Sequence, residues 1–341
     1  MNKHKTHPPK ISVIIPAYNT AALIADCLRS VLAQTYTDFE TIVVNDGSPD
    51  TPELELAMAP YLNRIVYIRQ ENKRAAGARN TAIRRARGEF LAFLDSDDIW
   101  FPEHLASQMK LLEDDPALDM AYSDCLVDDP QCPWKFMDIC PSHGEPTFVA
   151  LIAERCQIPI STVVVRKSAI VKAGLFDESL ARCDDYDMWL RTAFHGARIG
   201  YTRGLQVRAS GTRPGSLSQL RARMLEAYWM ILEKTARTLS VSQSQAELLI
   251  KRAQQIRAIY LLEEGKQQLR NREFTKAKEL LTEANQQLRR TRVSLAVLGL
   301  DIAPAATCNI VLLWNRILAG KVTQFRLPFV NSATTTSSTL R

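Results

Sequence analysis

Several features that would assign this sequence of 341 residues to a common class of protein are missing from it. It has only 13 glycines, and the segment after the first apolar run, Pro-Ala-Tyr-Asn-Thr, has none, so the Gly-x-Gly-x-x-Gly turn of dehydrogenases is absent. None of the 7 cysteines form a Cys-x-x-Cys pair, and no paired histidines follow Cys125, Cys132 and Cys140. A dehydrogenase and a zinc protein are therefore both disfavoured.

Long apolar segments are also missing. The most apolar stretch, Val293–Leu318, is interrupted by Asp301, Pro304 and Asn309, whereas a membrane-spanning helix needs about 20 nearly continuous apolar residues. The first ten residues are polar and basic and do not resemble a signal peptide. We therefore expect a reduced, cytoplasmic protein that does not cross a membrane.

Charge is distributed unevenly along the chain. The composition, 46% hydrophobic and 23% charged, is typical of a folded protein of about two domains, and the net charge is +6. The segment Arg221–Arg292 holds 15 basic and 8 acidic residues, which leaves −1 for the remainder. This segment is expected to face an anionic partner. Nucleic acid is not the expected partner, because no aromatic residues are interleaved with the charges.

The first hundred residues alternate between short apolar runs and helical periodicity. We predict strands at 11–15, 41–44, 65–68 and 90–94, and helices at 21–34, 53–61 and 77–87, with Thr20 as the cap of the first helix. The strand runs are apolar throughout, which indicates that helices cover both faces of the sheet. The predicted fold is therefore α/β, with a Rossmann-like, mostly parallel sheet.

From about Leu217 onward helical periodicity dominates. Apolar stripes on either side of a turn near Asn271 have weak tetratricopeptide-like spacing, but one helical pair is not a repeat array. We predict a helical C-terminal appendix at 219–330, followed by a disordered, Ser/Thr-rich tail at 331–341.

Polar segments follow the predicted strands. Because ligands bind beyond the carboxyl ends of parallel strands, these segments are where function is expected. Tyr18 follows the first strand, Asp46-Gly47-Ser48 the second, Arg79 lies in the helix after the third, and Asp95-Ser96-Asp97-Asp98 follows the fourth. Asp46 is suited to accept hydrogen bonds from a base or ribose, although an ordinary Asp-Gly turn explains it equally well.

Two groups of aspartates stand out. The first group is Asp95, Asp97 and Asp98. Their carboxylates would repel one another unless a cation offset their charge, which predicts Mg²⁺ or Mn²⁺ with a diphosphate. Alternatively, Asp97 or Asp98 caps a helix beginning near Pro102.

The second group is Asp184-Asp185-Tyr186-Asp187. It precedes the apolar Met188-Trp189-Leu190, which indicates a helix entering the core. The helix N-terminus is expected to lower the pKa of Asp185 and keep it ionised as a base; simple capping is the alternative.

In this order, PAYN, NDGSPDT, ENKRAAGARN, DSDDIW, GLFDE and DDYDMWLR closely resemble the inverting glycosyltransferases of family 2, which have the GT-A fold. The resemblance covers 10–218, which would be the catalytic domain. It implies that Pro16, Tyr18 and Asp46 hold the nucleoside of a nucleotide sugar, with Arg79 nearby, and family habit favours a UDP-sugar. It further implies that Asp95 and Asp97 meet ribose and diphosphate, with Asp97 on the metal, and that Asp185 is the catalytic base.

Two departures from the family pattern occur. Asp184 replaces a glutamate that is usual beside the base, and Arg213 stands where a histidine is usual. Arginine can still neutralise a phosphate. The implied mechanism is a single displacement with inversion: Asp185 takes a proton from the acceptor hydroxyl, and cations stabilise the departing diphosphate.

Alternatives remain open at this point. An Asp-nucleophile phosphoryl-transfer enzyme would not explain the distant aspartates, whereas a non-catalytic nucleotide-sugar-binding scaffold is permitted by Asp184 and Arg213. The expected acceptor is a glycan or a lipid-linked glycan, as in surface polysaccharide assembly. The basic helices and Val293–Leu318 are candidates for peripheral membrane contact, the alternative being that they pack on the rest of the chain.

Overall fold

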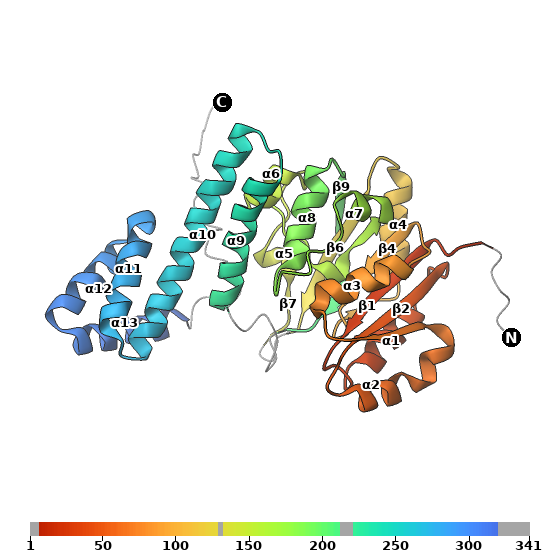
Figure 1. Cartoon of the computed structure of the whole chain (residues 1–341), viewed down its shortest axis with the longest axis horizontal. Coiled ribbons are helices and arrows are strands. Elements are labelled where there is room, and N and C mark those ends of the chain that lie inside the picture. Colours follow the sequence, from red (N-terminus) through yellow and green to blue (C-terminus); the bar gives the residue numbers. More distant parts are fainter. Residues whose placement is uncertain (1–6, 129–131, 212–220, 320–341) are drawn as a thin grey trace, which may run out of the picture. The chain divides into compact units, whose positions relative to one another are not determined.

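The computed structural model describes residues 7–128, 132–211 and 221–319. Its first part is a parallel four-stranded arrangement in the order β3-β2-β1-β4, of which Figure 1 labels β1, β2 and β4. The strands are β1 (Ile11–Ala17), β2 (Phe39–Asp46), β3 (Val66–Gln70) and β4 (Phe90–Phe93). The connecting helices are α1 (Ile24–Leu32), α2 (Thr51–Met58), the 3₁₀ helix η1 (Ala59–Arg64) and α3 (Arg74–Arg85).

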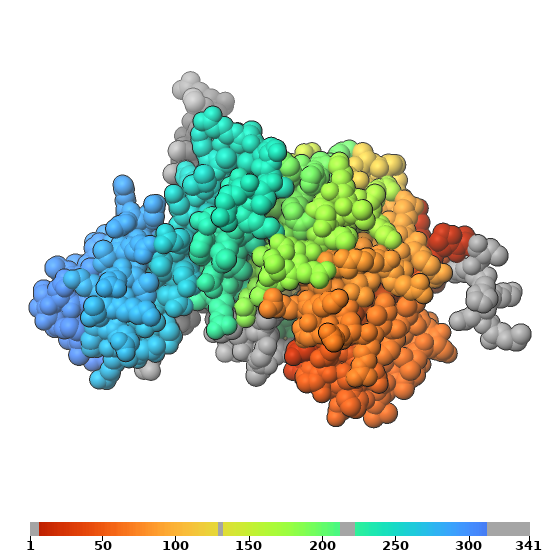
Figure 2. All heavy atoms as spheres, viewed as in Figure 1, coloured from red at the N-terminus to blue at the C-terminus, as the bar shows by residue number. Residues whose placement is uncertain are grey.

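Both faces of this sheet are covered, as the apolar runs predict. Ile11, Val13, Ile14 and Ile15 of β1 are all fully buried, although their side chains point alternately to the two faces. Helix α3 packs against β1 and β2, and Figure 2 shows one side of this part, in red and orange, filled by closely packed atoms. The predicted α/β fold with helices flanking the sheet is confirmed.

The remainder of the sheet is mixed. Strand β8 (Val164–Arg166) pairs antiparallel with β4, and the sheet continues through β6 (Met120–Val127), β9 (Ile199–Ala209) and β5 (Ile99–Trp100), with β7 (Trp134–Lys135) beside β6. Around these strands lie α4 (His104–Asp114), α5 (Phe136–Ile139), α6 (Phe148–Ile152), η2 (Ile160–Thr162), α7 (Lys167–Lys172) and α8 (Asp184–Phe194). Strand β9 pairs parallel with β6, whereas β5 pairs antiparallel with β9 and β8 antiparallel with β6. The sequence patterns did not predict these strands.

Helix α8 enters the core as expected. Met188, Trp189 and Leu190 are 0 to 1% exposed. Helix α9 (Arg221–Thr238) packs against α8, and Lys234 on α9 donates to Asp187 at 2.7 Å. Buried Asp187 also accepts from Arg191, one turn along α8, at 2.6 Å. These two cations compensate the buried charge of Asp187 and hold α9 against the helix that carries the acidic motif.

The chain divides into two compact units, Met1–Arg257 and Ala258–Arg341, and the division falls within the long helix α10 (Gln243–Arg270). The second unit continues with α11 (Phe274–Leu288), α12 (Thr291–Ile302) and α13 (Pro304–Ala319). Its core contains Leu269, Ala277, Leu281 and Ala284. The predicted helical C-terminal region is therefore present. No helix among the described residues is long and apolar enough to span a bilayer.

One local prediction was wrong and another was confirmed. Thr20 does not cap α1 with its side chain; its hydroxyl accepts a hydrogen bond from Ser96 at 3.0 Å. Val293–Leu318 is interrupted near Asp301 and Pro304, as predicted: α12 ends at Ile302, and Pro304 occupies the first position of α13, where a missing N–H costs nothing.

The predicted boundary at Ser218, the substituted Arg213 and the Ser/Thr-rich tail lie outside the described residues.

Candidate active site

The carboxyl ends of β1, β2 and β4 form one edge of the sheet, and most predicted site residues follow these ends. Pro16 is aligned with Val44 in the parallel pairing of β1 and β2, so Tyr18 and Asp46 come at neighbouring strand ends. The Tyr18 side chain is 51% exposed, which leaves its ring face accessible to a planar partner. The structure therefore places Pro16, Tyr18 and Asp46 together, and their roles in nucleoside binding stay predictions.

Asp46 is held rigidly. It is 2% exposed, and its Oδ1 accepts from the backbone N–H of Lys73 at 2.8 Å and from Gln70 Nε2 at 2.7 Å. The turn after it passes through Gly47 at a φ of +65°, where an added Cβ would lie 2.8 Å from the backbone nitrogen of Asn72. Only glycine fits this close approach. The turn thus fixes one oxygen of Asp46 and sets the position of the other.

The aspartates after β4 do not cap α4. The residue before that helix is Glu103, and Asp98 instead accepts from the Ser161 hydroxyl at 2.5 Å and from the backbone N–H of Ser210 at 2.7 Å. Oxygens of Asp95, Asp97 and Asp98 all lie within 4.8 Å of one another. Burial, followed by the charges of Asp97 and Asp95, raises the pKa of Asp98 well above its usual range.

This cluster fits a divalent cation. Its donors are carboxylate oxygens, the ligands that Mg²⁺ and Mn²⁺ prefer. The mutual repulsion that raises the pKa of Asp98 is the repulsion that a bound cation would remove. Among the described residues, no other group of three or more acidic, histidine or cysteine side chains is arranged to hold a metal, so Cys125, Cys132 and Cys140 do not form such a site.

Arg79 joins the two acidic motifs. It projects from α3, is 4% exposed, and donates from one terminal nitrogen to Asp95 at 2.7 Å and from the other to Asp184 at 2.6 Å. Burial opposes its charge, but Asp184 and Asp95 outweigh burial and raise the pKa of Arg79. Asp95 and Asp184 are 89 positions apart in the sequence. One guanidinium therefore brings both ends of the candidate site together.

Asp185 is not held in the ionised state by the helix N-terminus, so the prediction of a lowered pKa was wrong. Burial and the neighbouring charge of Asp184 raise the pKa of Asp185 to about 7, and Arg79 only partly offsets them. The residue before the helix, Cys183, has a φ of +56° and makes no side-chain cap. A carboxyl group with a pKa near neutrality is suited to exchange a proton with a substrate hydroxyl.

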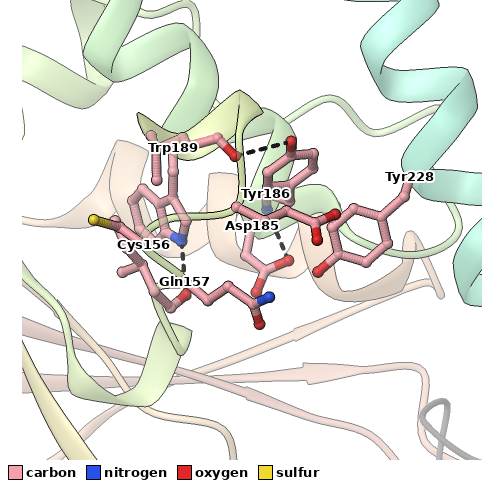
Figure 3. A pocket seen from close by; sticks show the side chains of 9 residues that line it. Cys156, Gln157, Asp185, Tyr186, Trp189 and Tyr228 are labelled. Atoms are coloured by element: carbon pink, nitrogen blue, oxygen red, sulfur yellow. Dashed lines mark hydrogen bonds between the residues drawn. The ribbon is translucent and has the colours of Figure 1, made fainter. Parts of the chain in front are cut away.

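Beside Asp185 lies a pocket whose polar residues the sequence analysis missed (Figure 3). Figure 3 shows the side chains of Gln157 and Tyr228 directed toward Asp185. Within the described part of the chain, neither the Gln157 amide nor the Tyr228 hydroxyl has a hydrogen-bond partner. The indole N–H of Trp189 donates to the backbone carbonyl of Ile158 at 3.2 Å, and the hydroxyl of Tyr186 donates to the carbonyl of Leu151 at 3.4 Å. These hydrogen bonds fix the two aromatic side chains that line the pocket.

A buried ion pair supports this pocket from behind. Glu154, which lines the pocket in a left-handed conformation with a φ of +53°, pairs with Arg252 on α10. Burial raises the pKa of Glu154, although Arg252 opposes that shift. Tyr228 on α9 thus lines the pocket beside Asp185, whereas Arg252 on α10 supports it only through its pair with Glu154.

The family model for glycosyl transferase family 2 matches residues 12–136. An uncharacterised glycosyltransferase of Rickettsia typhi is 32% identical over 201 residues, 55% of this chain and 60% of that protein. The Escherichia coli WfgD, a UDP-Glc:alpha-D-GlcNAc-diphosphoundecaprenol beta-1,3-glucosyltransferase, is 31% identical over 180 residues, 53% of this chain and 68% of WfgD. The match to the Rickettsia relative thus spans only about three-fifths of its length.

Among solved structures, S. aureus TarS resembles this chain over 90% of its length, with a TM-score of 0.62 and 18% identity, covering 91% of the TarS fragment. The same fragment in complex with UDP-GlcNAc gives a TM-score of 0.60. At this identity the likeness shows the fold, a GT-A fold with helices after it. With the family match and the relatives above 30% identity, it follows that the chain belongs to glycosyl transferase family 2.

Proposed function

We propose that this protein is an inverting glycosyltransferase that moves a sugar from a nucleotide-diphosphate sugar to an acceptor hydroxyl. The observation that carries the proposal is the double ion pair of Arg79, which brings Asp95 and the acidic start of α8 into one site. In that site the aspartates after β4 would bind the donor, and Asp185 would accept a proton from the acceptor.

On the donor side, Pro16, Tyr18 and Asp46 would bind the nucleoside. Tyr18 offers an exposed ring for stacking on the base, and Asp46 offers a fixed carboxylate for a ribose hydroxyl or a base N–H. Both terminal nitrogens of Arg79 are engaged by aspartates, so we assign it to holding Asp95 in place beside the diphosphate. Since TarS was solved with UDP-GlcNAc, a UDP-sugar is the donor we favour.

Mn²⁺ or Mg²⁺ would be held by Asp97, with Asp95 and Asp98 beside it. Bound there, the cation would neutralise charge that develops on the leaving diphosphate. The protein fixes the surroundings of this cluster: Ser161 and the Ser210 N–H orient Asp98, and Arg79 orients Asp95.

Asp185 would be the catalytic base. In its ionised form it accepts the proton of the attacking hydroxyl, the oxygen bonds to the anomeric carbon, and the bond to the diphosphate breaks on the opposite face. One displacement inverts the configuration and needs no covalent enzyme intermediate. The raised pKa of Asp185, about 7, makes it a stronger base than an exposed carboxylate once ionised.

The pocket beside Asp185 is where we place the acceptor. Gln157 and Tyr228 direct an amide and a phenol toward a hydroxylated ligand, and none of the described residues that line the pocket is a lysine or arginine. According to its name, WfgD transfers glucose to a sugar that is linked to diphosphoundecaprenol. By similarity we propose a glycan or lipid-linked glycan here, in surface polysaccharide assembly at a cytoplasmic location.

The experiment is to add UDP-glucose, UDP-GlcNAc and GDP-mannose in turn with Mn²⁺, and to follow thermal stabilisation and release of nucleoside diphosphate. We expect at least one donor to raise the melting temperature and to be hydrolysed slowly without acceptor. Binding without any release, with acceptor mixtures present, would instead indicate a nucleotide-sugar-binding scaffold. Absence of binding for every donor would contradict the proposal.

A further inference from the structure

Helix α12 in the C-terminal unit is apolar on two opposite sides. Val293, Ala296 and Leu300 are 5 to 9% exposed and pack within the unit. Leu295, Leu298 and Ile302 are 56, 57 and 77% exposed. Three large aliphatic side chains on the outer side of a short helix are more than the single exposed residues that any protein surface carries.

The exposed residues form one stripe. At 100° per residue, positions 295, 298 and 302 fall within about 60° of one another, on the side opposite the buried stripe. Arg292 precedes Leu295 by three residues and is exposed, as are Arg289 and Arg290 just before the helix. We call this set, Arg289, Arg290, Arg292, Leu295, Leu298 and Ile302, the outer face of α12.

Little negative charge opposes these arginines. The acidic residue of α12, Asp301, is paired with Lys278 on α11. Across Ala258–Arg341 there are 12 Lys and Arg against 6 Asp and Glu, so this unit carries +6 and Met1–Arg257 carries no net charge. The whole net charge of the chain therefore belongs to the unit that exposes the apolar stripe.

The described side chains of the neighbouring helix α13 leave this stripe exposed. Helix α13 approaches α12 closely at Gly299, where an added Cβ would lie 2.6 Å from the Thr307 hydroxyl. Even so, Leu298 and Ile302 on either side of Gly299 keep more than half of their surface exposed, and Ile310 on α13 is 50% exposed. Packing within the described part of the unit thus leaves the outer face open.

We propose that the outer face of α12 docks on an anionic lipid surface. Leu295, Leu298 and Ile302 would enter the boundary between headgroups and acyl chains, and the three arginines would meet lipid phosphates, with the helix lying in the plane of the membrane. A second copy of the chain is a poorer occupant, because pairing this face with itself brings together two units that each carry +6. The proposal does not depend on the proposed catalytic activity.

The test is flotation of the full chain with vesicles of phosphatidylcholine alone or mixed with phosphatidylglycerol. We expect binding to the anionic vesicles that weakens with salt, and little binding to neutral ones. The variant L295Q/L298Q/I302Q removes the apolar stripe, and R289Q/R290Q/R292Q removes the charge. Each should bind the anionic vesicles at least about tenfold more weakly, because the first loses apolar burial at the headgroup boundary and the second loses attraction to the anionic headgroups.

The matched control is L56Q/L62Q/V171Q, which removes three exposed aliphatic side chains of the other unit, 75, 45 and 54% exposed. It should float like the unchanged protein. Thermal melts confirm that each variant is folded, and light scattering reports the oligomeric state. Absence of flotation at low salt, or equal flotation of the face variants and the control, would overturn the proposal. So would a change in oligomeric state on mutating the face with vesicle binding unaltered.

Discussion

The two units of this chain use charge in opposite ways. The N-terminal unit has no net charge, yet it concentrates carboxylates at one sheet edge and compensates them with one buried arginine, Arg79. The C-terminal unit carries +6 and keeps Arg289, Arg290 and Arg292 exposed. Buried and paired charges position the side chains of a candidate active site, whereas exposed charges without a partner of opposite sign favour association with an anionic surface. The difference predicts that mutations in the two units will separate turnover from docking.

The largest effect is expected at Asp97. The variant D97N keeps the shape of the side chain but weakens a cation ligand, so turnover should fall by about a thousandfold or more. Chelation of divalent ions should have the same effect on the unchanged protein and be reversed by Mn²⁺. Calorimetry with Mn²⁺ and a UDP-sugar checks the cause, and D114N, at an exposed ion pair of α4, is the control. Full activity of D97N would show that the cation, if required, binds elsewhere.

Arg79 should matter for stability as well as for activity. The variant R79M leaves Asp95 and Asp184 without their shared partner, and breaking such a buried pair costs about 3 kcal/mol. Urea denaturation measures this loss. The control R84M changes the same helix at an arginine that is 59% exposed and 3.6 Å from Glu178, where the cost should stay below about 0.5 kcal/mol. Equal losses would mean that Arg79 does not hold the site together.

The pH dependence follows from Asp185. Its ionised form is the active one and its pKa is raised to about 7, so turnover should rise with pH between 5 and 7 and level off above. The same shift makes the folded state bind a proton that the unfolded state has lost, so stability should decrease as pH rises from about 4 through 7. The variant D185N should therefore be more stable than the unchanged protein at pH 8. A flat pH profile of turnover would contradict this assignment.

The smallest effect is expected from the other unit. The variant L295Q/L298Q/I302Q should change turnover with a water-soluble acceptor by less than about twofold, because surface substitutions away from a site cost little. Initial rates with donor and soluble acceptor measure this. A large loss of turnover would mean that the outer face of α12 takes part in catalysis, and the division between the two units would fail.

The sequence predicted the parallel half of the sheet well, for a local reason. Strands such as β1 are apolar throughout, and this signal is contained in a few consecutive residues. Strands β5 and β8 have only 2 and 3 residues, too few to show a period, so the antiparallel pairings that they make with β9, β4 and β6 were missed. Thr20 was assigned as a cap because its type suits one, whereas the folded chain places its hydroxyl against Ser96.

The candidate site, like the fold, could be predicted from the sequence only in part. Asp46, Asp95 and Asp97 follow strands, and the topology of a parallel sheet brings strand ends together. The sequence does not reveal that Arg79 pairs with Asp184, 105 residues away, nor that burial outweighs the helix N-terminus at Asp185. Gln157 and Tyr228 belong to no motif, and only the packing of α9 brings Tyr228 to the pocket.

The most direct measurement compares D185N with D184N. Donor binding is measured by calorimetry with Mn²⁺, and sugar transfer is measured on the same preparations. If Asp185 is the base, D185N binds donor as the unchanged protein does and loses at least about a thousandfold in transfer, whereas D184N mainly loses stability because it breaks the pair with Arg79. Transfer by D185N at the unchanged rate would contradict the account.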